Sequence, residues 1–201
     1  MHYLMYALLD KNQAENSEDA RTEVNEILSN DDSFCGEGGR FGSPVADWFV
    51  IGGRWSGDLA KNLLDKDFFK EVDKRIPHDK FGFTTKDVAD HKAEFQKIWE
   101  ELGGKDANPY NRDSYEHGGG EDDAMIVDEK VWEKIILPIL NNKKEYKAEY
   151  SQVVRKNDYN LPEPILADVG EEGETSFNDK VEDVKKSVVG KKWIVVVDYH
   201  N

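Results

Sequence analysis

The sequence has a single cysteine and no long apolar run, and each of these shortages excludes a class of protein. Cys35 is the only cysteine among the 201 residues, so an internal disulfide and a zinc site built from cysteines are both excluded. No segment approaches the about 20 apolar residues of a membrane-spanning helix, and the first ten residues lack the basic region and cleavage site of a secretory signal. We therefore expect a cytoplasmic protein without a membrane segment.

Positive charge is also scarce. The chain has 42 acidic and 27 basic residues, which gives a formal net charge of −15. A direct nucleic-acid binder or a binder of anionic membranes needs a positive face, so neither class is expected. Acidic clusters such as Glu121-Asp122-Asp123 are short and are interpreted as solubilising surface, although an acidic face could also imitate DNA or bind a basic protein partner.

Four short apolar runs predict the strands of one sheet. They lie at 2–9, 47–51, 124–127 and 192–199. The first run does not alternate between apolar and polar residues, so we expect a central strand that is buried on both faces.

Helical spacing predicts the elements that cover this sheet. Ser17 is the expected N-cap of a helix whose apolar stripe contains Ala20, Val24, Ile27 and Leu28. Asp128 is the expected cap of a second helix, which Pro138 should kink or shorten, and Ser176 of a third.

The predicted fold is therefore a single α+β domain over 1–201. We expect an open, mainly antiparallel sheet with helices packed on it, and interpret it as ferredoxin-like. Loop insertions rich in polar residues and glycine are expected near 30–46, 103–122 and 156–176.

The segment that follows the second strand carries the most chemical information. Gly52-Gly53-Arg54-Trp55-Ser56-Gly57 places glycines, an arginine and a tryptophan directly after apolar residues. Glycines permit close backbone approach, arginine suits a carboxylate or phosphate, and tryptophan can stack on a flat ring. Because Gly38-Gly39-Arg40-Phe41 repeats the pattern, we expect Arg40, Phe41, Gly52, Gly53, Arg54, Trp55 and Ser56 to form one ligand-binding surface. A structural role is the equal alternative, with Trp48 and Trp55 in the core and Arg54 paired to Asp47 or Asp58.

A second candidate group lies on the last strand. Asp198 and His200 are two residues apart and should project from one face, where His2 of the first strand could join them. An isolated pair of this kind is more often a polar strand end than an acid/base site.

Motifs for catalysis are otherwise missing. Neither glycine cluster continues as a phosphate-binding or dinucleotide-binding loop, and Ser56 lacks the nucleophile-elbow pattern. None of the five histidines belongs to a metal motif, so we expect no metal and no cofactor.

The segment from Asp47 to Gly57 resembles a set of uncharacterised bacterial and phage proteins with an aromatic Ile-Gly-Gly-Arg-Trp-Ser-Gly motif. These proteins also begin and end with strands like those at 2–9 and 193–200. The resemblance implies a bacterial or phage origin and brings no function with it.

Three functions follow as hypotheses. The first is non-enzymatic binding of a small anionic, nucleotide-like ligand, which in a phage would sequester a host defence signal in the infected cell. The second is an acidic protein-interaction inhibitor or DNA mimic. The third is a hydrolase or transferase centred on Asp198 and His200.

Overall fold

The computed structural model describes residues 2–31, 34–35, 46–63, 97, 100–101, 123–142, 145–147, 152–154, 164–170, 175, 177 and 179–200. Its strands are β1 (His2–Asp10), β2 (Trp48–Ile51), β3 (Ala124–Ile126), β4 (Glu145–Lys147), β5 (Gln152–Val154), β6 (Ile165–Asp168) and β7 (Lys192–His200). Its α-helices are α1 (Ser17–Asn30), α2 (Asp58–Leu63), α5 (Glu129–Val131), α6 (Leu137–Asn142) and α7 (Val181–Val188). Shorter turns of other types are η1 (Lys11–Gln13), η2 (Gly53–Trp55) and the π-helical η4 (Trp132–Ile136).

The strands form one seven-stranded sheet in the order β2-β7-β1-β6-β5-β4, and β3 also pairs with β7. Within the part of the chain that the structure describes, β1 and β6 are parallel and the other five pairings are antiparallel. The predicted α+β class and the open, mainly antiparallel sheet are confirmed.

The two central strands, β1 and β7, are buried on both faces, and for β1 the absence of alternation predicted this. Successive side chains of a strand point to opposite faces, so each strand contributes to two cores. In β1, Leu4, Tyr6 and Leu8 belong to one core, whereas Met5, Ala7 and Leu9 belong to the other.

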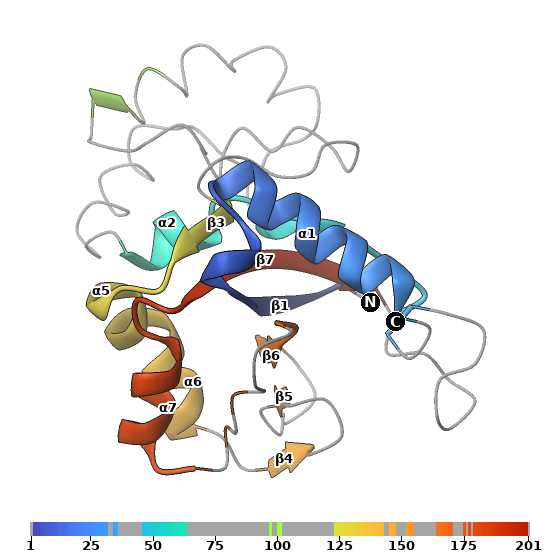
Figure 1. Ribbon diagram of the computed structural model, residues 1–201. Helices are drawn as coiled ribbons and strands as arrows, with labels where there is room; N and C mark the ends of the chain where they lie inside the picture. Colours follow the sequence, from blue (N-terminus) through green and yellow to red (C-terminus); the bar gives the residue numbers. More distant parts are fainter. Residues whose placement is uncertain are drawn as a thin grey trace, which may run out of the picture.

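Helix α1 covers one face of the sheet (Figure 1), where Ala20, Val24 and Leu28 are buried against β1, β2, β3, β6 and β7. The stripe predicted from the sequence is therefore the packed one. The predicted cap is wrong by one residue, because Asn16 has the extended backbone and its side chain accepts from the Asp19 N–H at 3.0 Å. Asn16 and Ser17 are both good caps in sequence, and only the backbone conformation separates them.

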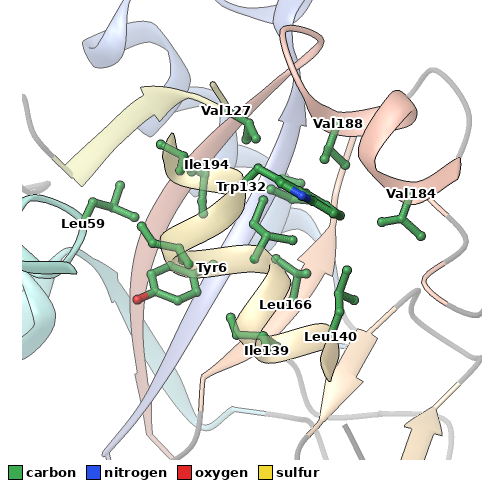
Figure 2. Packing of buried hydrophobic residues seen from close by; sticks show 14 of the residues in the cluster. Tyr6, Leu59, Val127, Trp132, Ile139, Leu140, Leu166, Val184, Val188 and Ile194 are labelled. Atoms are coloured by element: carbon green, nitrogen blue, oxygen red, sulfur yellow. The ribbon is translucent and has the colours of Figure 1, made fainter. Parts of the chain in front are cut away.

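The opposite face is covered by α2, by the helical run from α5 to α6, and by α7. In Figure 2 the Trp132 indole lies beside Val184 and Val188 of α7, while Ile139 and Leu140 of α6 face Leu166 of β6. Asp128 caps this run as predicted, accepting from the Val131 N–H at 2.8 Å. Pro138 does not end the helix: a wide π turn at Trp132–Ile136 precedes it, and α6 continues to Asn142.

The structure differs from the sequence predictions near β6 and at the start of α7. Ile165–Asp168, inside the loop insertion expected at 156–176, forms β6 next to the central strand. Helix α7 begins at Val181 with Lys180 in the cap position, and Ser176 lies outside the described residues, as does the whole expected insertion at 103–122.

The ferredoxin-like topology stays an interpretation. The chain order β1, α6, β5, β6, α7, β7 follows that motif, but α1 on the other face and the additional strands β2, β3 and β4 lie outside it. Among the described helices, none combines the length and the apolar character that a bilayer span requires.

Candidate functional site

The glycine-rich motif forms a tight turn at the end of β2. Gly52, Gly53 and Gly57 all have positive φ angles, of 75°, 54° and 80°. At Gly53 the demand is also steric, because a Cβ atom there would lie 2.6 Å from Cβ and Oδ2 of Asp198 and 2.7 Å from Cγ1 of Val50. Glycine is therefore needed at position 53 for its conformation and for the close approach of β7.

Asp198 connects this turn to the last strand. Its Oδ2 accepts a hydrogen bond from the Arg54 backbone N–H at 2.9 Å, and the residue is fully buried. The structure thus brings two candidate residues from separate parts of the sequence together. Because the carboxylate is enclosed and bonded to the backbone, its visible role is to hold the turn.

A second buried carboxylate holds the other end of the turn. Asp123 is fully buried, and its oxygens accept from the Ser56 hydroxyl at 2.6 Å and from the Gly57 N–H at 2.7 Å. The interpretation of this acidic cluster as solubilising surface is wrong for Asp123. Nothing in the sequence distinguishes it from Glu121 and Asp122 beside it, because its partners lie more than 60 positions away.

The backbone N–H groups of the turn are largely used by these internal contacts. Besides those of Arg54 and Gly57, the N–H of Gly52 donates to Val196 O at 2.8 Å and that of Trp55 to Gly52 O at 3.0 Å. The N–H of Ser56 donates to Gly53 O at 3.3 Å. A ligand at this turn would therefore be bound mainly through hydrogen-bond donors of the side chains.

Two side-chain donors stand out on the turn. Arg54 is exposed, so its guanidinium lies at the surface while its backbone is anchored by Asp198. Trp55 packs against the core that contains Tyr6 and Leu59, and its buried Nε1 has no hydrogen-bond acceptor among the described residues. Buried donors without an acceptor are rare and call for an explanation.

A polar network lies beside the turn at the start of α2. The Tyr6 hydroxyl donates a short hydrogen bond to Asp58, and the Asn62 side-chain amide donates to the same carboxylate at 2.8 Å. Figure 2 shows the ring of Tyr6 in the core, with its hydroxyl at the margin of the cluster. This network was not anticipated from the sequence, where Tyr6 reads as an apolar strand residue.

His200 is held by Asp47 at the end of β7. Its Nδ1 lies 2.8 Å and 3.0 Å from the two Asp47 oxygens, and the Trp48 indole stacks on the imidazole with ring centroids 5.5 Å apart. The hydrogen bond to His200 is the main reason that the pKa of Asp47 lies below its usual value of 3.8. The backbone of His2 pairs with that of His200, whereas Asp198 bonds to the turn.

The remaining predicted site residues are Arg40, Phe41 and Ser56. Arg40 and Phe41 lie outside the described residues, so the second half of the repeated pattern has no described position. Ser56 bonds to a carboxylate and not to an imidazole, which is not the pairing of an activated serine nucleophile. Within the described residues, no group of three His, Cys, Asp or Glu side chains is arranged to hold a metal ion.

Comparisons with known proteins do not add to this geometry: no family model, curated protein or solved structure matches the chain. The resemblance of the Asp47–Gly57 segment to bacterial and phage proteins therefore stays an interpretation of that segment alone. The site is a turn held by two buried carboxylates. It carries Arg54 at the surface and the buried indole N–H of Trp55.

Proposed function

We propose that the protein binds a small anionic ligand at the turn formed by Gly52–Gly57, without carrying out a reaction on it. The observation that supports this proposal is the anchoring of Arg54, whose backbone is fixed by a buried carboxylate while its side chain is exposed. A guanidinium on a rigid base loses less conformational freedom when it binds, so it can form a paired contact with a carboxylate or phosphate efficiently.

The chemistry of the two donors sets the class of ligand. The Arg54 guanidinium and the Trp55 indole N–H can only donate hydrogen bonds. Their best partner is therefore a group rich in acceptors, such as a phosphate or a carboxylate. The buried Trp55 N–H adds to this argument, because an acceptor that reached it would satisfy a donor whose burial alone costs about 1–3 kcal/mol.

A nucleotide-like ligand is the specific form of this proposal. The exposed Arg54 suits a phosphate, and the neighbouring aromatic side chain of Trp55 suits a planar ring. In a phage, a protein of this kind would sequester a host signal, an extension that rests on the resemblance of the motif. The hydrolase alternative receives no support from the burial of Asp198. The acidic-mimic alternative is weakened because Asp10, Asp123 and Asp198 are buried and add no charge to an acidic surface.

A thermal-shift screen tests the proposal. Nucleotides and cyclic nucleotides are added to the purified protein, and a ligand at 100 times its Kd should raise the stability by about 2.7 kcal/mol. Arg54→Gln should abolish the shift while the apo protein melts as the wild type does. Trp55→Phe keeps most of the ring volume, removes the unpaired donor and should reduce the shift.

Arg21→Gln is the matched control, because Arg21 lies on α1 at the other face of the sheet and the change removes the same charge. A shift of equal size in wild type, Arg54→Gln and Arg21→Gln would place the ligand elsewhere. An absence of any shift across the panel would refute the nucleotide-like form of the proposal.

A further inference from the structure

A pocket of about 690 Å³ lies at the end of the sheet where β1 finishes and β7 begins. It is about 20 Å along β7 from Asp198, at a rise of roughly 3.3 Å per residue, and so is separate from the glycine turn. Its lining consists of Asp10, Lys11, Asn12, Ser187, Gly190, Lys191 and Lys192. The volume falls within the range of small-molecule sites, about 300–1,000 Å³.

One wall of this pocket is a buried ionic cluster. Lys192 Nζ lies 2.6 Å from Asp10 Oδ1 and 3.1 Å from Asp168, and the three side chains are 4%, 7% and 0% exposed. Asp168 is bonded further, accepting from the N–H of Thr175 at 2.8 Å and of Gly170 at 3.1 Å. Gly170 packs so closely against Asp10 that an added Cβ atom would clash with the Asp10 carboxylate. Such enclosure fixes the wall in one arrangement.

The rim of the pocket is also held in place. The Lys11 N–H donates to Lys191 O at 2.8 Å, and the Gly190 N–H donates to Val127 O at 2.7 Å. Gly190 has a φ of +73°, and a Cβ there would meet no atom within 4 Å. The backbone that carries the lining side chains is therefore tied to η1 on one side and to the end of β3 on the other, which makes the pocket preformed.

Its charge is opposite to that of the chain as a whole. The positive charge of Lys192 is already offset by Asp10 and Asp168. Lys11 and Lys191 are exposed, and neither has an ion pair within the described part of the chain. Two unpaired lysines at the mouth of a pocket, in a chain of net charge −15, form a local positive region that attracts a small anion.

The neutral side chains refine the class of ligand. Ser187 Oγ donates to Val184 O at 2.7 Å and lies 3.5 Å from Thr175 Oγ1, which leaves it one lone pair as an acceptor. The exposed Asn12 amide can both donate and accept. Acceptors of this kind suit ligand hydroxyl groups. The lining contains no aromatic side chain on which a base could stack. We propose that this pocket binds a small hydroxyl-bearing anion, a phosphate ester or a hydroxycarboxylate, independently of the ligand proposed for the Arg54 turn.

Titration of the ¹⁵N-labelled protein tests this inference. The probes are glucose 6-phosphate and citrate, which separate phosphate from carboxylate, with glucose as the neutral control. Either anion should shift the amide resonances of Lys11, Asn12, Gly190 and Lys191 in a saturable manner, whereas glucose should not. Shifts that are absent at these amides, or spread evenly over exposed lysines, would overturn the inference.

Charge-matched variants complete the test. Lys11→Gln/Lys191→Gln should weaken binding by about tenfold, the effect of removing two modest charged contacts. Lys134→Gln/Lys180→Gln removes the same charge from exposed positions outside the pocket and should change the affinity by less than about twofold. Equal weakening in both pairs would mean general charge screening and would refute a specific site. Arg54→Gln should leave these resonance shifts unchanged, so this test and that of the glycine turn can fail separately.

Discussion

Gly53→Ala is the sharpest test of how the carboxylate-braced turn is built. The substitution adds one methyl group at a position with a φ of +54°, directly against Asp198 and Val50. It alters no charge and no side-chain hydrogen-bonding group. Any loss of stability must therefore come from the backbone conformation and from the contacts with Asp198 of β7 and Val50 of β2.

The magnitude follows from these two terms. An L residue held in the left-handed region costs roughly 1–2 kcal/mol. Forcing a methyl group to 2.6 Å from Asp198 adds an overpacking cost of about 1–3 kcal/mol, because the neighbour is a fully buried strand residue. We expect Gly53→Ala to lower the free energy of unfolding by about 2–5 kcal/mol.

Urea denaturation followed by far-UV circular dichroism measures this loss, and Gly190→Ala is the matched control. Gly190 also has a positive φ, of +73°, but open space surrounds the position of its Cβ. Its substitution should cost the conformational term alone, about 1–2 kcal/mol. A Gly53→Ala variant no less stable than Gly190→Ala would refute the close approach of Asp198 to the turn.

Further predictions concern the charged groups. Lys192→Met leaves Asp10 and Asp168 without their shared cation and should lower the free energy of unfolding by about 3–5 kcal/mol, whereas Lys191→Met at the exposed neighbouring position should change it by less than about 0.5 kcal/mol. A loss under about 1 kcal/mol for Lys192→Met would contradict the buried cluster. The pKa of Asp47 is lower in the folded protein than its usual 3.8, so its stabilising effect is present above that value and is lost as the pH falls through the lowered pKa. The difference in stability between wild type and Asp47→Asn, measured by urea denaturation, should therefore shrink under acidic conditions and should disappear when His200→Leu is added. Burial, and then the charge of Asp47, raise the pKa of the Cys35 thiol above 9.0. Alkylation by iodoacetamide at neutral pH should therefore be slower than for free cysteine; a faster reaction would show an activated thiol.

The strongest elements of the fold could be predicted from the sequence because each carries an unambiguous local pattern. The apolar runs at 2–9 and 192–199 became the two central strands, and the stripe from Ala20 to Leu28 packs as expected. β6 was missed because it contains only four residues, follows two prolines and resembles the surrounding loop. Its strand character arises from pairing with β1, which no local pattern records.

The candidate site shows the same division. The glycines of the turn were identifiable, since residues free to adopt positive φ are few. The residues that brace them were not, because Asp123 and Asp198 find their partners in distant parts of the chain. Asp10 and Lys192 likewise read as ordinary polar ends of strands until the antiparallel pairing of β1 with β7 places them side by side.

That pairing also has a consequence for how the protein is made. Residues 2 and 200 are register partners, and β2 and β3 both pair with β7. During synthesis, neither core can be completed until β7 has left the ribosome. The apolar side chains of β1 and α1 therefore stay exposed while the chain between α1 and β7 is translated. Contacts so distant in sequence form slowly, and apolar faces that are exposed in the meantime are prone to aggregation until β7 is available.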